Sequence, residues 1–298
     1  MRNRILTKTM NYLRSCPWAA QAPIAELHLT RYFSTVELAN ASVGACMSYY
    51  RLSNNLLKAA EDVLGKHLSG RAAIGIHEGD IDELVSQVTS NAEQRYLVAT
   101  SLMASLASAL SAPMIVSGGD DVFATVCQRP SPWVDDAESA LVVGFGGYLE
   151  ALAEASTIKR LHVIDLFYER LCNTIEDELN VYRHKFPQKV ISASACLSGT
   201  NLLSDYDLIA ITGSTLCNGT LEDILGGARS DSIVVLQGQS ASMHPRYLFE
   251  EGIAWISTTV KPHHLGRVAR ADYNGSALRP YLDGGLSIVY LVPRHGRS

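Results

Sequence analysis

The chain has 298 residues, of which 47% are apolar and 18% are charged, a composition typical of globular proteins. It excludes a disordered or low-complexity chain, and the length predicts two domains or one domain with a large cap. A net charge of -5 lacks the basic excess that binding to nucleic-acid phosphates requires. We therefore expect a small molecule as the partner, and no nucleic acid.

Six cysteines stand at positions 16, 46, 127, 172, 196 and 217, and no two of them form a CxxC pair. This spacing argues against a zinc ribbon and against a dense disulfide framework. It favours a reducing, cytoplasmic location and no metal cofactor. The basic segment 1–16 interrupts its apolar residues with Thr, Lys and Asn, so it predicts a first helix instead of a signal peptide.

Residues 97–119 carry no charge and are long enough to cross a bilayer. Several serines and Pro113 interrupt this segment. We therefore expect a buried helix followed by a strand, and no membrane partner. Such an uncharged helix could pack within its own domain or against a second copy of the chain, so a homodimer remains open.

The first part of the chain is predicted to be rich in helix. Apolar residues recur at helical spacing over 54–67 and 91–109. Short strands are predicted at 71–76, 114–116 and 122–126. Two prolines within 128–132 indicate a connector, so we expect an α-rich cap domain at 1–136 and a second domain at 137–298.

The second part alternates short apolar strands with helices, which indicates a parallel sheet with helices on its faces. The predicted strands are 141–143, 161–164, 190–192, 208–211, 233–236 and 253–256, with helices at 149–155 and 221–225. A last strand at 286–292 closes the edge of the sheet or forms a hairpin partner. The fold class is thus α/β, a Rossmann-like sheet domain with an α-rich N-terminal cap.

A glycine-rich turn follows the first of these strands, and an acidic residue follows the second. The candidate cofactor-binding residues here are Gly144, Phe145, Gly146, Gly147, Tyr148 and Asp165. Glycines allow close approach of a ligand to the backbone, and a carboxylate at this place can bind ribose hydroxyls. Leu149 replaces the third glycine of the dinucleotide pattern, which favours S-adenosylmethionine over NAD. The alternative is a plain glycine turn with Asp165 capping the next helix.

A second polar segment follows the strand at 208–211. Thr212 and Gly213 are candidate cofactor-binding residues, and Ser214, Thr215 and Asn218 are candidate catalytic residues. Open α/β sheets bind ligands at this edge, and these side chains recognise polar groups without adding charge. Part of the pattern also fits a turn at Asn218 and a helix start at Thr220. Cys217 lies in the same loop, but no adjacent base marks it as a nucleophile.

The segments 143–147, 211–215, 218–221 and 235–240 together resemble the Rossmann-like family of heavy-metal chelation domains. The resemblance covers roughly residues 95–262. It implies a small α/β domain ahead of a Rossmann-like domain. Gln239 stands where the family has proline, so this loop could hold a different ligand.

The glycine turn, Asp165 and the polar pair Ser214 and Thr215 are also similar to the azetidine-2-carboxylate synthases. This resemblance implies that S-adenosylmethionine is cyclised by its own amine, with methylthioadenosine as the leaving group. Such a reaction depends mainly on orientation and desolvation of a neutral amine. Aromatic rings could hold the sulfonium, and the candidates are Tyr49, Tyr50, Tyr148 and Tyr182. A small-molecule methyltransferase with the same cofactor pocket is the second reading.

A third reading is a protein that binds a heavy metal or a chelate without turnover. His77, Glu78 and Asp80 are grouped within four residues, and His263 and His264 are adjacent. Neighbouring residues on a regular element face different ways, so neither group by itself forms a coordination sphere. A solvated turn is the alternative explanation for the first group.

Overall fold

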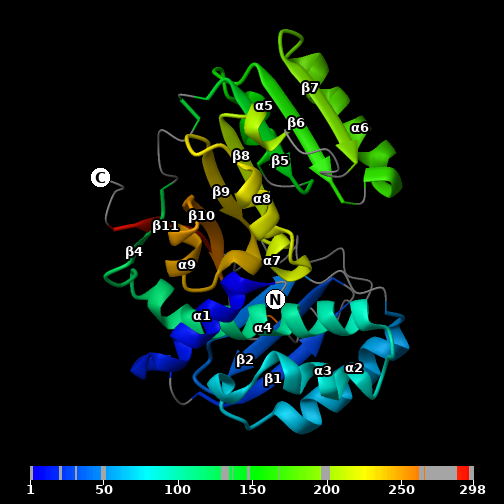
Figure 1. Ribbon diagram of the computed structural model, residues 1–298, viewed down its shortest axis with the longest axis vertical. Helices are drawn as coiled ribbons and strands as arrows, with labels where there is room; N and C mark the ends of the chain where they lie inside the picture. Colours follow the sequence, from blue (N-terminus) through cyan, green and yellow to red (C-terminus); the bar gives the residue numbers. More distant parts are fainter. Residues whose placement is uncertain are drawn as a thin grey trace.

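The computed structural model describes residues 3–19, 22–30, 32–47, 52–128, 134–135, 137–145, 148–166, 168–195, 202–261, 265 and 287–294. The described chain forms a small lobe and a large lobe, with α1 and α4 at their junction (Figure 1). The first helix, α1 (Arg4–Ser15), forms as predicted. It is tied to the large lobe, because the Ile5 N–H donates to the Glu222 carboxylate at 3.1 Å.

The small lobe consists of a three-stranded antiparallel sheet in the order β1-β2-β3 and the helices that cover it. Its elements are β1 (Ile24–Leu29), β2 (Phe33–Leu38), β3 (Val43–Met47), α2 (Asn54–Leu68), α3 (Glu78–Ser86), α4 (Ala92–Val116) and the short helices η1 (Pro17–Ala19) and η2 (Ala73–Gly75). At Gly44, α4 lies so close to β3 that an added Cβ would be 1.8 Å from the Ser105 carbonyl oxygen. The helix and this sheet therefore form one packed layer pair.

Several predictions for this lobe were wrong. The sheet β1-β2-β3 was not expected, and the predicted strand at 71–76 is replaced by η2 over residues 73–75. Residues 114–116 continue α4 for another turn because Ile115 is buried in the core and Ser117 caps the helix. The predicted helices at 54–67 and 91–109 are confirmed.

The uncharged segment predicted as a buried helix is α4. By length and composition alone it could cross a membrane, but 83% of its most apolar window is buried inside the protein. It packs along β2 and β3 on one side and reaches α1 and α7 on another. Burial in the core accounts for its composition.

The large lobe is an eight-stranded sheet in the order β4-β11-β10-β9-β8-β5-β6-β7. Its strands are β4 (Phe123–Val126), β5 (Ser139–Val143), β6 (Arg160–Asp165), β7 (Val190–Ala195), β8 (Leu208–Thr212), β9 (Ile233–Gln237), β10 (Ile253–Val260) and β11 (Ser287–Pro293). Its helices are α5 (Leu149–Glu154), α6 (Tyr168–Lys185), η3 (Leu203–Asp205), α7 (Thr215–Asn218), α8 (Leu221–Gly227), η4 (Gln239–Ala241) and α9 (Arg246–Glu250).

The six strands from β5 to β10 are parallel and confirm the predicted sheet. Their spatial order is that of a doubly wound Rossmann sheet, and it reverses between β5 and β8. β11 is antiparallel to β10 and lies between β10 and β4, so it does not form the edge of the sheet. β4 pairs with β11, so a strand from the segment predicted as the cap domain belongs to the large sheet.

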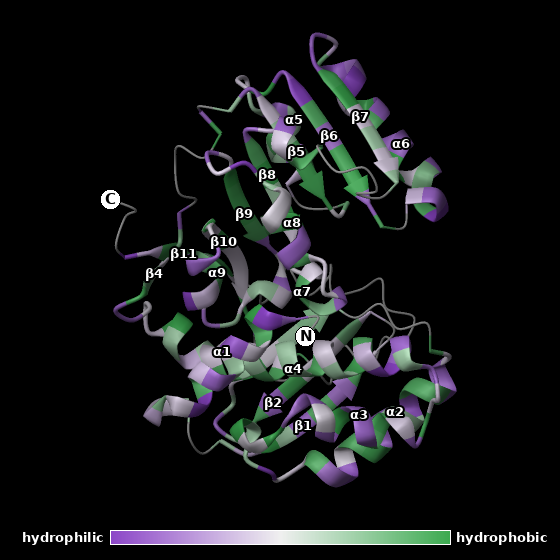
Figure 2. Ribbon diagram, in the orientation of Figure 1, coloured by the Kyte–Doolittle hydropathy of each residue, from purple (hydrophilic) through white to green (hydrophobic). Residues whose placement is uncertain are grey.

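Alternate residues of the parallel strands point to two different cores. On β5, Leu141 and Val143 face the core shared with α4, α8 and the small lobe, whereas Ala140 and Val142 face α5 and α6. The central strands β8 and β9 are hydrophobic along their length, and α6 is hydrophilic on its outer surface (Figure 2). Because both faces of the sheet are covered, residues on both sides of its strands are apolar, and the strands appear in the sequence as continuous apolar segments.

Candidate functional site

The candidate site lies where β5 and β8 end side by side, at the reversal of the strand order. Open α/β sheets bind their ligands at this carboxyl edge. Gly144 follows β5 with a φ of +87°, and an added Cβ would lie 2.3 Å from Cγ2 of Thr212. The two strand ends therefore touch directly, and only glycine fits at this point.

The turn after β5 is held by the end of β6. The Gly144 N–H donates to the Ile164 carbonyl at 2.7 Å, and the Phe145 N–H donates to Oδ2 of Asp165 at 2.8 Å. Asp165 is 8% exposed. Its carboxylate thus caps the glycine turn, while its contact with ribose and the alternative, a cap on the next helix, both stay predictions.

Tyr148 packs away from this edge. Its ring meets Trp255 edge-on, with 5.9 Å between the ring centroids, in the core that faces α5 and α6. Gly146 and Gly147, also predicted as cofactor-binding residues, lie outside the described residues. Among the described members of the first predicted group, Gly144, Phe145 and Asp165 are therefore brought together at the carboxyl edge.

The second predicted group forms one tight turn at the end of β8. The Thr215 hydroxyl donates to the Thr212 carbonyl at 2.7 Å, and the Ser214 hydroxyl lies 3.3 Å from that of Thr212. Ser214 and Thr215 are buried. Asn218 accepts from the Thr220 N–H at 3.1 Å, as the turn reading predicted. The described hydrogen bonds of Ser214 and Thr215 hold the start of α7, and that of Asn218 holds its end.

Gly213 is packed under the next strand end. Its N–H donates to the Gln237 carbonyl. An added Cβ would lie 2.9 Å from the Ala241 nitrogen in η4. The loop after β9 therefore lies against the loop after β8, and both belong to the same edge.

The two described aromatic candidates, Tyr148 and Tyr182, do not meet at this edge. Tyr182 lies near the end of α6, which runs back from the carboxyl end of β6 to the start of β7. That position is at the opposite end of the sheet from Ser214. Tyr49 and Tyr50 lie outside the described residues.

The group proposed for a metal is the beginning of α3. The His77 N–H donates to the Asp80 carboxylate at 3.1 Å, which is one half of a capping box. Asp80 also pairs with Arg71. His263 and His264 lie outside the described residues, and within the described part no three His, Cys, Asp or Glu side chains group as metal ligands.

A cluster that the sequence interpretation missed lies where β10 ends. The Lys261 Nζ is 3.3 Å from the Ser108 hydroxyl and also bonds to the Ser242 hydroxyl. Burial lowers the pKa of Lys261 to about 7, although the Cys46 thiol acts in the opposite direction. The sequence holds one indication of this cluster: Lys261 is the first charged residue after the uncharged strand at 253–260.

Two buried thiols, Cys46 on β3 and Cys217 on α7, meet next to this cluster, where the two lobes pack together. The hydrogen bond with Cys46 and the burial of the thiol both raise the pKa of Cys217. Ser240 lies between these elements and accepts a 2.9 Å hydrogen bond from the Met47 N–H. Cys217 therefore stays protonated and is a poor nucleophile, because a reactive thiol needs a lowered pKa.

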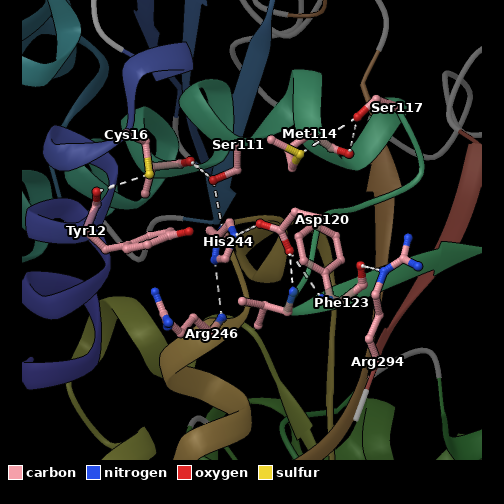
Figure 3. Close-up of polar contacts among 12 residues, drawn as sticks. Tyr12, Cys16, Ser111, Met114, Ser117, Asp120, Phe123, His244, Arg246 and Arg294 are labelled. Atoms are coloured by element: carbon pink, nitrogen blue, oxygen red, sulfur yellow. Dashed lines mark hydrogen bonds and ion pairs between the residues drawn. The ribbon is translucent and has the colours of Figure 1, made fainter.

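A buried His–Asp pair was also missed (Figure 3). Nε2 of His244 lies 2.7 Å from Oδ2 of Asp120, and the Arg246 N–H donates to Nδ1 at 3.4 Å. His244 is 0% exposed, and Tyr12 and Phe123 pack on its ring. Because both ring nitrogens are partnered and sealed from solvent, this pair stabilises the junction of α4, β4 and α9.

Comparisons with known proteins agree with this architecture. Residues 134–281 match the family model described as "DUF364: Putative heavy-metal chelation". None of the curated proteins matches the sequence. The match supports the first of the two resemblances, and nothing in these comparisons supports the azetidine-2-carboxylate synthases.

Two solved structures share the fold over nearly the whole chain. A DUF364 protein of unknown function from Pyrococcus horikoshii has a TM-score of 0.57 and 13% identity, covering 98% of this chain and 99% of its own. One from Desulfitobacterium hafniense DCB-2 has a TM-score of 0.61 and 15% identity, covering 97% and 98%. Residues 134–281 thus carry the DUF364 sequence pattern, within a chain that has the fold of two solved members of that family.

Proposed function

We propose that this protein binds a nucleoside-containing small molecule, S-adenosylmethionine first among them, at the carboxyl edge formed by β5, β6 and β8. The observation that carries the proposal is the reversal of strand order between β5 and β8, with Gly144 against Thr212 at that point. The buried carboxylate of Asp165 stands beside it, at the end of β6.

Asp165 would accept hydrogen bonds from ribose hydroxyls while still capping the turn, because a carboxylate accepts several hydrogen bonds. The glycine turn would bring the backbone close to the nucleoside. The uncharged side chains Ser214, Thr215 and Asn218 fit less well, since their described hydrogen bonds are local. The fit therefore favours nucleoside binding by β5 and β6 more than direct catalysis by the turn after β8.

The chemistry proposed first is intramolecular alkyl transfer within S-adenosylmethionine, in the reducing cytoplasm. The contribution of this chain would be orientation and exclusion of water at the junction of the lobes. Methyl transfer to a small acceptor is the second candidate, and chelate or metal binding without turnover is the third. The family description supports the third, and no described ligand group favours it over the first two.

Titration calorimetry with S-adenosylmethionine and with methylthioadenosine tests the binding step. Asp165→Asn is the informative variant, because an amide oxygen still accepts from Phe145 but the charge is lost. We expect at least about tenfold weaker binding, the loss of one charge-assisted hydrogen bond. Failure of the wild-type protein to bind either compound would overturn the proposal.

A matched control is Asp207→Asn at the opposite edge of the sheet. Asp207 also accepts hydrogen bonds from backbone N–H groups, here those of Glu138 and Ser139 at the start of β5. We expect this variant to bind nucleosides like the wild type. An equal loss in both variants would assign the effect to the fold and not to the site.

Mass spectrometry of the products after incubation with S-adenosylmethionine alone separates the reactions. Methylthioadenosine with a four-carbon amino acid indicates cyclisation, whereas S-adenosylhomocysteine indicates methyl transfer to a co-purified acceptor. Binding without either product leaves a carrier as the function of the site.

A further inference from the structure

Two serine hydroxyl groups contact the buried amine of Lys261. Its Nζ contacts the hydroxyls of Ser108, at 3.3 Å, and of Ser242. These two hydroxyls are themselves 2.6 Å apart. Both serines are buried, whereas Lys261 keeps part of its surface exposed. The three side chains come from α4, from the residue after η4 and from the end of β10.

Lys189 shows what a structural buried lysine looks like in this protein. Its Nζ donates to the carbonyl oxygens of Ala153, at 2.7 Å, and of Ala155, which end α5. Carbonyl oxygens only accept, so they match the donors of an ammonium group. Lys189 therefore caps a helix end.

The partners of Lys261 can donate as well as accept. Each hydroxyl oxygen accepts an N–H of the amine and can pass its own proton on, which a carbonyl oxygen cannot do. Among the described residues no carboxylate bonds to this lysine; its third contact is the Thr259 carbonyl at 3.4 Å. The titratable group that acts on it is the Cys46 thiol, and burial outweighs it, leaving a pKa of about 7. At neutral pH the amine is therefore neutral in a larger fraction of molecules than an exposed lysine is.

The position of the cluster also suits chemistry. β10 is parallel to β9, so Lys261 and the loop after β9 lie at the carboxyl edge of the sheet, on which α4 packs. Ser242 belongs to that loop, and its hydroxyl donates a 2.7 Å hydrogen bond to the Gln239 carbonyl, which holds it in place. Amines desolvated in this way are the ones that act as nucleophiles toward carbonyl groups.

We propose that Lys261 is a nucleophilic amine that condenses with the carbonyl carbon of a small aldehyde or ketone, with Ser242 and Ser108 as the proton relay. Nζ adds to the carbonyl carbon, and the carbonyl oxygen takes up a proton through the hydroxyls. Loss of water then forms the C=N bond, and both hydrogens that leave the amine end in that water. The proposal is independent of nucleoside binding at β5 and β6.

Reductive trapping of the full-length protein tests this assignment. The protein is treated at pH 7 with limiting acetaldehyde and sodium cyanoborohydride, and modified lysines are located by peptide mass spectrometry over time. We expect Lys261 to be ethylated at least about tenfold faster than exposed Lys185, because the larger neutral fraction outweighs reduced access. The rate at Lys261 should rise with pH and level off just above neutrality.

Two comparisons within the same sample make the result decisive. Lys189 is buried too, but its partners are carbonyl oxygens, so we expect it to stay unmodified. Modification of Lys261 no faster than that of Lys185 or Lys189, or a rate that keeps rising to pH 10, would overturn the proposal.

The serines are tested by substitution. Ser242→Ala should slow adduct formation at Lys261 about tenfold, and Ser242→Thr should restore most of the rate, because it returns the hydroxyl. Circular dichroism and the melting temperature show that each variant is folded. A wild-type rate in Ser242→Ala would remove Ser242 from the relay.

Discussion

The Phe145 backbone N–H donates a 2.8 Å hydrogen bond to Oδ2 of Asp165, so the end of β6 holds the turn that follows β5. One carboxylate therefore links two neighbouring strand ends at the point where the strand order reverses. Any ligand bound there would meet a turn that is already ordered, which lowers the entropy cost of binding.

Substitution of Asp165 should separate its structural task from its charge. Asp165→Ala leaves the Phe145 N–H without this acceptor, and we expect the free energy of unfolding to fall by about 1–3 kcal/mol. Asp165→Asn keeps an acceptor oxygen and should lose less than half as much. Urea denaturation measures both, and equal losses would contradict the capping role of the carboxylate oxygen.

Gly144 is expected to be the most sensitive glycine of the site. Gly144→Ala meets a φ of +87° and a contact of 2.3 Å with Cγ2 of Thr212, and we expect a loss of about 3 kcal/mol in the free energy of unfolding. Gly70→Ala is the matched control, since its φ is +79° but nothing lies within 4 Å.

Urea denaturation should therefore give a loss of only about 1–2 kcal/mol for Gly70→Ala, which is the conformational cost alone. Adding Thr212→Ser to Gly144→Ala removes the clashing methyl group and should recover part of the difference. If the double variant were no more stable than Gly144→Ala, the contact with Thr212 would not be the cause.

Stability should fall in mild acid because of the pair His244 and Asp120. Burial lowers the pKa of His244. Burial raises the pKa of Asp120, but the hydrogen bonds from His244, Val122 and Phe123 outweigh it and lower this pKa. Both folded-state pKa values lie below the unfolded ones, so the unfolded state binds more protons as the pH falls.

The contribution of His244 is therefore present above its ordinary pKa of 6.5 and is lost as the pH drops below that value. That of Asp120 is present above 3.8 and is lost at lower pH. Urea denaturation at several pH values between 7.5 and 5, each about one half unit apart, measures the slope. His244→Gln should be less stable at pH 7.5 and show a shallower slope; an unchanged slope would exclude His244 as its source.

The contact between α4 and β3 should tolerate no side chain at Gly44. An added Cβ would lie 1.8 Å from the Ser105 carbonyl oxygen, which is helix backbone and cannot move alone. We expect Gly44→Ala to lower the free energy of unfolding by at least about 3 kcal/mol. Gly65→Ala in α2, where nothing lies within 4 Å, should be neutral or stabilising by about 1 kcal/mol. Thermal melts of both variants give the comparison.

Periodicity and composition were sufficient for the helices α1, α2 and α4 and for the parallel strands of the large lobe. Each of these segments has a strong local pattern, either an apolar helical face or a short apolar run between turns. The small sheet β1-β2-β3 was missed because its strands are half polar: Ser34, Thr35 and Glu37 are buried by packing against other elements, not by their own hydrophobicity. The helix α3 was missed because its capping residues resemble a metal-ligand group.

Local sequence patterns were enough to specify the α/β class, the parallel sheet and the edge at which Gly144, Asp165 and Thr212 meet. All three follow from local pattern and from the rule that parallel strands end at one edge. The contacts of these side chains depend instead on how the elements pack, and this packing places the rings of Tyr148 and Tyr182 away from the edge. It also brought together Ser108, Ser242 and Lys261, which are up to 153 positions apart. No sequence spacing predicts such a cluster, because its residues come together only when α4 packs against the end of β10.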